Sequence, residues 1–239
     1  MDKFNIAGLN ILAEYYYDRM KTNMPKYSHD FDGESDIIIS VPKERSMAIQ
    51  DGNPHLTLGA CEYMLAGSQF YKALLDFDGM MLHSSAIMMD GFAYLFSARS
   101  GTGKSTHTQL WQELFGSDKA VIFNDDKPAL RIIDGKIYAC GTPFSGKSDE
   151  NLNVIVPLKG ICFIERSETN VIEKISPFKA VPLILNQTIF RNEDEELQNK
   201  VYDMIDKVIS LVPIYKLGCN ISTDAAKLSH DVMSGKAII

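Results

Sequence analysis

Hydrophobic and polar positions follow the periods of strands and helices along the chain, and the period changes at turn residues. Residues 36–41 form a β-branched run that predicts a strand. Residues 58–77 place apolar side chains at helical spacing, which predicts a helix packed on a sheet. Residues 27–34 are polar and predict a loop between the chain start and the strand. The first 80 residues are therefore expected to form an N-terminal α/β extension.

Two pairs of predicted strands are each joined by an Asp-Gly dipeptide, which is a strong signal of a tight hairpin. The segments are residues 80–89 and 92–96 around Asp90-Gly91, and residues 129–133 and 136–139 around Asp134-Gly135. A doubly wound parallel sheet would need a crossover of about a dozen residues where the second hairpin stands. The pattern therefore predicts a mixed β-sheet.

The remaining periodic segments predict helices that flank this sheet. Leu110, Trp111, Leu114 and Phe115 give one apolar helical face, which Gly116 ends. Further strands are expected at residues 120–123, 160–165, 170–175 and 213–217, and further helices at 181–190, 195–211 and 223–233. Because no Gly/Pro/Ser-rich linker divides the chain, residues 81–239 are expected to form an α/β domain continuous with the extension of residues 1–80.

Composition and charge narrow the class of protein. Apolar residues make up 45% of the 239 residues and charged ones 23%, which excludes a disordered chain. The net charge of −7 gives no general attraction to nucleic acid or anionic lipid, so neither is an expected partner, although a local basic patch stays open. No apolar run approaches the roughly 20 residues that span a bilayer. Four widely spaced cysteines, with no C-x-x-C pair, favour buried reduced thiols in a cytoplasmic protein.

The sharpest chemical signal is a phosphate loop that starts at Ala98, where the usual pattern has glycine. Glycines let backbone N–H groups turn toward phosphate oxygens, Lys104 supplies a charge for the β- and γ-phosphates, and the Ser105 hydroxyl can bind Mg²⁺. A predicted strand precedes the loop and a predicted helix follows it, so the pattern predicts binding of a nucleoside triphosphate. The expected nucleotide-binding residues of the loop are Ser100, Gly101, Thr102, Gly103, Lys104, Ser105 and Thr106.

Asp125 and Asp126 follow the predicted strand of residues 120–123. In phosphate-loop proteins an acid at a strand end typically holds Mg²⁺, and a second acid can accept a proton from an attacking hydroxyl. An Asp pair that caps a turn before Pro128 is the alternative interpretation. His83 stands before the first hairpin and could pair with either acid. A single His in an apolar run is more often a core residue.

A second glycine-containing loop, residues 141–148, leaves the second hairpin. Its glycines, hydroxyls and lysine suit a loop that closes over a phosphate or presents a substrate, with an exposed turn as the alternative. Gly146 permits a close backbone approach, and Lys147 could add charge near the γ-phosphate. Gly146 and Lys147 are therefore the expected nucleotide-binding residues of this second loop.

Taken together, these motifs resemble the catalytic domain of HPr kinase/phosphorylase, which has a phosphoenolpyruvate-carboxykinase-like fold. The resemblance is good over residues 83–147 and loose elsewhere. The sequence is more similar still to a group of HPr-kinase-like proteins, some of which are tailoring kinases of ribosomally made peptides such as lasso-peptide precursors. The motifs shared with this group are S-G-T-G-K-S-T-H-T-x-L-W at residues 100–111, N-D-D-K-P at 124–128, G-T-P-x-x-G-K at 141–147 and V-P-x-Y-x-L-x-C at 212–219.

The resemblance implies ATP and Mg²⁺ bound at residues 101–105, Asp125 as catalytic base and Asp126 as the metal-side acid together with Ser105. It further implies His83 as partner to the base. The extra N-terminal domain of HPr kinase/phosphorylase is absent, and the signature that follows its acid pair is replaced by residues 141–147. These departures argue against HPr itself as substrate, against phosphorolysis and against a hexamer, and they leave a homo-oligomer open.

The sequence therefore predicts an ATP- and Mg²⁺-dependent kinase that phosphorylates a hydroxyl group, a Ser on a peptide or protein. One alternative is a kinase of small-molecule hydroxyl groups with the same apparatus. Another is a nucleotide-binding regulator without catalysis, which would need no general base. No motif in the sequence identifies the acceptor.

Overall fold

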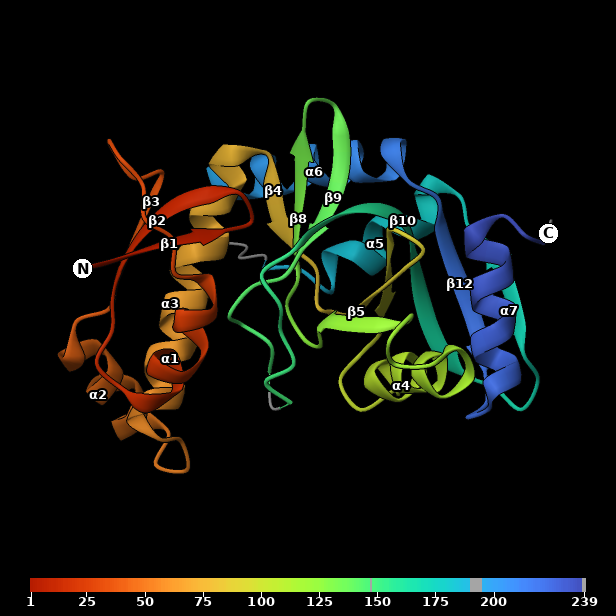
Figure 1. Ribbon diagram of the computed structural model, residues 1–239, viewed down its shortest axis with the longest axis horizontal. Coiled ribbons are helices and arrows are strands. Elements are labelled where there is room, and N and C mark those ends of the chain that lie inside the picture. Colours follow the sequence, from red (N-terminus) through yellow and green to blue (C-terminus); the bar gives the residue numbers. More distant parts are fainter. Residues whose placement is uncertain (147, 190–194, 238–239) are drawn as a thin grey trace.

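The computed structural model describes residues 1–146, 148–189 and 195–237. Its N-terminal unit, residues 1–77, is a small sheet with helices packed on it (Figure 1). In this sheet β1 and β2 are antiparallel, and β2 and β3 are parallel. The elements are β1 (Asp2–Ile6), β2 (Leu9–Glu14), α1 (Asp18–Asn23), β3 (Ile37–Ser40), α2 (Lys43–Gly52) and α3 (Leu58–Leu74), with 3₁₀ turns at Met24–Tyr27 and Leu75–Phe77.

The rest of the described chain is built on a nine-stranded sheet of order β4-β8-β9-β10-β6-β5-β7, with β12 beside β10 and β11 beside β12. The strands are β4 (Gly79–Met81), β5 (Ser84–Met89), β6 (Phe92–Ser97), β7 (Val121–Asn124), β8 (Ala129–Ile133), β9 (Lys136–Cys140), β10 (Ile155–Arg166), β11 (Val171–Lys174) and β12 (Ile214–Cys219). The first residues of β10 pair antiparallel with β9, and its later residues pair parallel with β6 and β12. The prediction of an α/β fold with a mixed sheet is confirmed.

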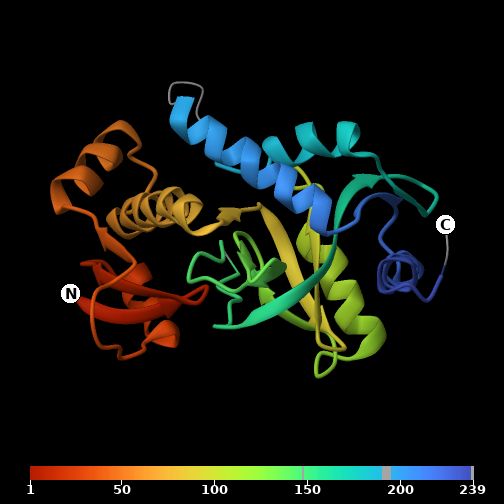
Figure 2. The same ribbon diagram turned by 90° about the horizontal axis from the view of Figure 1, so that it is seen from above.

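Helices cover both faces of this sheet, as the view from above shows (Figure 2). On one side, α5 (Pro177–Leu185) and α6 (Glu195–Leu211) contribute buried residues to one apolar cluster with the sheet. On the other side, α4 (Lys104–Phe115) and α7 (Thr223–Ser234) contribute to a second cluster around Trp111. The predicted flanking helices are therefore present, and they bury the sheet between two layers.

Both predicted hairpins are confirmed, because Asp90 and Asp134 take the positive φ angles, 53° and 50°, of tight Asp-Gly turns. The prediction of one strand over residues 80–89 is wrong. β4 pairs with β8 and ends at Met81. Leu82 and His83 belong to no strand, and β5 then pairs with β6. The break occurs because the backbone N–H of His83 donates to the carbonyl oxygen of Gln187 at 2.7 Å, outside both sheet partners.

Two further expectations differ from the structure. The helix expected at residues 181–190 is α5, which begins at Pro177, a favourable first helical position, and ends at Leu185. Residue 190 lies outside the described residues. The sequence also gave no signal for β1 and β2, since the hairpin turn between them is Ala7-Gly8 rather than an Asp-Gly or Asn-Gly pair.

The N-terminal unit and the larger sheet share one apolar cluster. Phe4, Ile11 and Phe70 of the N-terminal unit belong to the same cluster as Ala129 and Phe144. Figure 1 shows this unit at one end of the molecule, with α3 on the side that faces the loops after β9. No described helix is both long and apolar enough to cross a membrane. The four cysteines are buried and form no disulfide.

Candidate phosphoryl-transfer site

The predicted phosphate loop connects the end of β6 to the first turn of α4. Gly101 and Gly103 have φ angles of +76° and +125°, and a Cβ atom added at either would meet no atom within 4 Å. The loop thus opens onto free space in a conformation that favours glycine. Lys104 is only 8% exposed, and its Nζ donates to the carbonyl oxygen of Ala98 at 3.2 Å. Burial lowers the pKa of Lys104, and the charges of Asp126 and Asp125 partly offset this effect.

The order of strands brings the acid pair, Asp125 and Asp126, to this loop. β5 is antiparallel to both β6 and β7, so the ends of β6 and β7 and the start of β5 lie at one edge of the sheet. The Oγ of Ser85 donates to Oδ1 of Asp125 at 2.6 Å and is 2.8 Å from Oγ1 of Thr108 on α4. Asp125 is therefore tied to the helix that begins at the phosphate loop.

Asp126 lies between the imidazole of His83 and the ammonium group of Lys127. His83 Nε2 is 3.1 Å from Asp126 Oδ1, and the Lys127 ammonium contacts Asp126 Oδ2. Burial raises the pKa of Asp126, but the hydrogen bonds and charges of His83 and Lys127 outweigh it and hold the pKa at about 2. Asp126 is accordingly ionised at neutral pH. The structure places His83 against Asp126 and not against Asp125, the partner that the resemblance implies.

The second loop, residues 141–148, lies directly against the acid pair. A Cβ atom on Gly146 would be 2.7 Å from the Cβ atom of Asp126, so the close approach requires glycine here. The loop is fixed to β7 because Asn124 Nδ2 donates to the carbonyl oxygen of Thr142 at 2.9 Å. Lys147, the other expected nucleotide-binding residue of this loop, lies outside the described residues.

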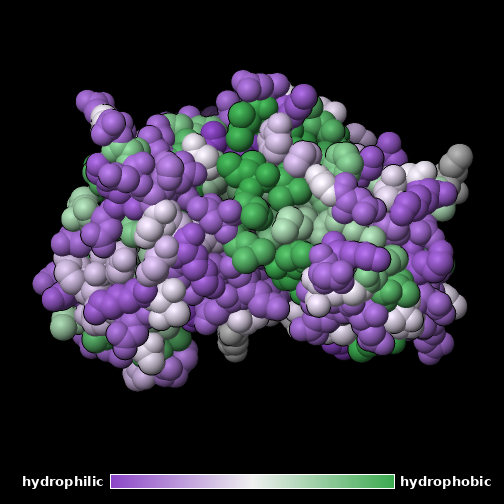
Figure 3. All heavy atoms as spheres, in the orientation of Figure 1, coloured by the Kyte–Doolittle hydropathy of each residue, from purple (hydrophilic) through white to green (hydrophobic). Residues whose placement is uncertain are grey.

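These groups line one cleft of about 590 Å³. Of the expected site residues, the cleft contains Ser100, Gly101, Gly103, Lys104, Ser105, Thr106, His83, Asp125, Asp126 and Gly146. Thr102 does not line this cleft and instead lines two other cavities, of about 270 and 540 Å³. Figure 3 shows the face of the molecule seen in Figure 1, where hydrophobic residues gather at the centre and hydrophilic residues cover most of the N-terminal unit.

The opposite wall of the cleft comes from the N-terminal unit, which the sequence did not indicate. Its lining residues are Arg19, Leu56, Ala60, Tyr63 and Met64. The Arg19 guanidinium donates to the carbonyl oxygen of Gly146, and the Gly146 N–H donates to Tyr63 Oη at 3.1 Å. A single sequence offers no signal for these residues, since they lie in short polar or amphipathic segments far from every phosphate-binding motif.

The phosphate loop is also braced from its other side. The Arg166 guanidinium at the end of β10 donates to the carbonyl oxygen of Gly101 at 2.6 Å. His107, on the first turns of α4, is buried and lies 2.9 Å from Ser229 Oγ on α7. Burial lowers the pKa of His107 to about 4, so this residue packs α4 against α7 as a neutral imidazole.

The oxygen ligands of the cleft fit a magnesium ion that arrives with a nucleotide. Within the described ranges, no group of three or more His, Cys, Asp or Glu side chains is arranged to hold a metal ion. Mg²⁺ in phosphoryl-transfer enzymes usually takes one or two carboxylates together with substrate phosphates and water. Ser105 and the acid pair, facing the open loop, provide such a partial ligand set.

Comparisons with known proteins add a likeness of fold. No family model matches the sequence, and no curated protein does. Among solved structures, the HPr(Ser) kinase/phosphatase from Coxiella burnetii aligns with 65% of this chain and 95% of its own, at 12% identity and a TM-score of 0.37. The likeness concerns the α/β fold alone, and values this low support no argument about activity.

Proposed function

We propose that the protein is an ATP- and Mg²⁺-dependent kinase that phosphorylates a hydroxyl group, a Ser of a peptide or protein. One observation carries this proposal: Lys104, Ser105 and the acid pair, from separate parts of the chain, face a single cleft. An open glycine loop at a helix N-terminus binds phosphate, and a carboxylate beside it can accept a proton.

In the proposed reaction the acceptor oxygen forms a bond to the γ-phosphorus of ATP. The bond between that phosphorus and the β–γ bridging oxygen breaks, and its electron pair stays on ADP. The hydroxyl proton passes to Asp125. Lys104 and the loop N–H groups stabilise the negative charge on the transferred phosphoryl group. When bound, Mg²⁺ neutralises phosphate charge.

The environments of the two acids support different roles. Asp126, with its pKa at about 2, suits a permanent anion on the metal side with Ser105. Asp125 accepts a hydrogen bond from the Ser85 hydroxyl and has no cationic partner among the described ion pairs, which leaves it the better proton acceptor. His83 would then act as a positioning residue for Asp126.

The wall from the N-terminal unit supports a peptide acceptor over a small molecule. Met64, which lines the cleft, is 47% exposed, and Met47 on neighbouring α2 is 49% exposed. Flexible methionine side chains adapt to varied apolar partners. Together with the motifs shared with peptide-tailoring kinases, this surface favours a precursor peptide as the substrate.

The test combines nucleotide binding with transfer from labelled ATP. Lys104→Ala should lower transfer to Ser-containing peptides by at least about hundredfold, because the positive charge that stabilises the transferred phosphoryl group is lost. Exposed Lys136→Ala, at the first residue of β9, is the matched control and should behave as the wild type. Circular dichroism checks that both variants fold.

The outcomes separate the candidate functions. Transfer to small hydroxyl compounds but to no peptide would indicate the small-molecule kinase. Magnesium-dependent ATP binding without any transfer would indicate the regulator. A wild-type protein that binds no nucleotide, or a Lys104→Ala variant that transfers normally, would overturn the proposal.

A further inference from the structure

Arg19 extends from α1 of the N-terminal unit into the cleft that contains Lys104 and Asp126. Its side chain is 30% exposed, and the guanidinium carbon lies 4.1 Å from the centre of the Tyr63 ring. The guanidinium also donates to the carbonyl oxygen of Gly146, the residue packed against Asp126. Arg19 thus places a cation beside the acid pair, opposite the phosphate loop.

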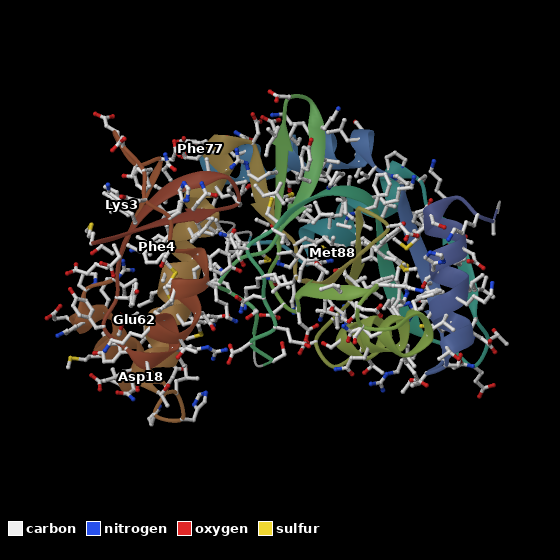
Figure 4. The ribbon with its side chains drawn as sticks, in the orientation of Figure 1. Lys3, Phe4, Asp18, Glu62, Phe77 and Met88 are labelled. Atoms are coloured by element: carbon white, nitrogen blue, oxygen red, sulfur yellow. The ribbon has the colours of Figure 1, made fainter. Side chains whose placement is uncertain are left out.

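A buried carboxylate fixes the helix that bears Arg19. Glu62 on α3 is 1% exposed and accepts hydrogen bonds from the backbone N–H groups of Tyr16 and Tyr17, at 2.7 and 3.0 Å. These two residues directly precede α1, which begins at Asp18. Figure 4 labels Asp18 and Glu62, which lie near each other in this view. With its helix anchored and its guanidinium stacked on Tyr63, Arg19 loses little entropy when it binds a ligand.

The contacts of Arg19 leave hydrogen-bonding capacity unused. Its Nε is buried and has no hydrogen-bond partner. Asp149 Oδ1 is 3.7 Å from Nη2, which is an ion pair but too long for a hydrogen bond. The described hydrogen bonds of the guanidinium use one N–H donor, at Gly146, while the side chain is 30% exposed and lines the cleft, where a planar guanidinium matches the oxygens of a phosphoryl group. A purely structural clamp on the second loop would not need this surplus.

We infer that Arg19 binds the phosphoryl group during its transfer, so that the N-terminal unit completes the catalytic site. The inference rests on the proposed function. In the step described above, Arg19 carries no proton and forms no covalent bond; it binds the equatorial oxygens as negative charge spreads over them. Arginines in this role raise phosphoryl-transfer rates by about 10³ or more in phosphate-loop enzymes.

The test needs no knowledge of the acceptor. Calorimetry compares the affinity for Mg·ADP alone with the affinity in the presence of aluminium fluoride, a planar mimic of the phosphoryl group. Arg19→Ala should keep its Mg·ADP affinity within about twofold and lose at least about tenfold for the fluoride complex. Arg19→Lys should recover part of this loss. Arg45→Ala, an exposed arginine on α2, is the control, and melting temperatures check folding.

A second variant distinguishes this role from a loop clamp. Asp149→Asn removes the carboxylate that competes for Arg19, so it should strengthen binding of the fluoride complex. If Arg19 only held the second loop through Asp149 and Gly146, both variants would weaken binding. If aluminium fluoride raised the Mg·ADP affinity of Arg19→Ala as much as that of the wild type, the inference would be overturned and the kinase proposal would stand. A wild type that binds no Mg·ADP would overturn both.

Discussion

Lys104 and Asp126 face the same cleft with opposite charges, and burial acts against the charged form of each. For Lys104 the burial effect dominates and lowers the pKa. For Asp126 the contacts with His83 and Lys127 dominate and hold the pKa at about 2. Asp126 therefore stays ionised, whereas the charged form of Lys104 would be stabilised by an added anion. A bound triphosphate would supply that anion.

Asp125→Asn and Asp126→Asn should fail in different ways. An Asn at position 125 keeps the shape but cannot take the proton, so nucleotide–Mg²⁺ affinity should persist while transfer falls by at least about hundredfold. An Asn at position 126 removes an ionised carboxylate, so Mg²⁺ should bind more weakly and nucleotide binding should need a higher Mg²⁺ concentration. Titrations of Mg²⁺ against nucleotide affinity measure both effects. Weakened Mg²⁺ binding in Asp125→Asn but not in Asp126→Asn would mean that the roles are exchanged.

His107 should make stability depend on pH. Its pKa is about 4 in the folded protein against 6.5 for a free side chain, so the unfolded chain binds the proton more readily. The folded state consequently loses about 3 kcal/mol as pH falls from 6.5 to 4, with no further loss from this group below that range. Urea unfolding of the wild type and His107→Gln at several pH values measures it. The same slope in both proteins would contradict this assignment.

Among the elements, α1 and the second loop depend on contacts from other parts of the chain. α1 has six residues and no side-chain cap at its Tyr17 N-cap, and Glu62 instead anchors the residues just before it by accepting from the N–H groups of Tyr16 and Tyr17. The second loop in turn is held between Tyr63, Arg19 and Asp126. Helix and loop both line the cleft, the helix through Arg19 and the loop through Gly146.

Glu62→Ala should therefore lower the free energy of unfolding by about 2 kcal/mol, since two partly buried backbone N–H groups lose their acceptor. Glu62→Gln keeps one acceptor oxygen and should lose less. Urea unfolding gives the stabilities. We also expect Glu62→Ala to weaken the aluminium fluoride complex more than Mg·ADP, because the helix under Arg19 is loosened. Full retention of fluoride binding would show that α1 needs no such anchor.

At the scale of the whole molecule, the N-terminal unit and the larger sheet share buried contacts. Beyond the common apolar cluster, the buried Arg131 donates from Nη1 to the carbonyl oxygen of Ala7 at 2.9 Å. Tyr27 Oη donates to Asn151 Oδ1 at 3.2 Å. Such contacts couple the two parts energetically, so they are expected to fold and unfold together.

Trp111 offers a test of this coupling, because it is the one tryptophan of the chain and lies on α4. Ile11→Ala, a fully buried change in the N-terminal sheet, should cost about 3 kcal/mol. The unfolding midpoint seen by Trp111 fluorescence should fall together with that seen by circular dichroism. A Trp111 midpoint that stays fixed while the far-ultraviolet signal shows an earlier transition would mean two independent units.

The sequence by itself determined the features that depend on neighbouring residues. The two Asp-Gly hairpins, the helix at Glu195–Leu211 and the glycine-containing loop before α4 follow from turn chemistry, periodicity and glycine spacing, which act over a few residues. The second hairpin, which stands where a parallel sheet would have a crossover, also predicted the mixed sheet. The acid pair marked the end of the strand that is now β7.

Only the tertiary structure decided which distant groups meet. The pairing of His83 with Asp126, the break at Leu82, and the two sets of partners of β10 follow from how the sheet is assembled. Arg19 reaches Gly146 across 127 positions of sequence. Such contacts depend on the packing of the whole chain, and no local sequence pattern reports the free energy of that packing. A single sequence therefore indicated the predicted phosphate-binding half of the cleft but not its opposite wall.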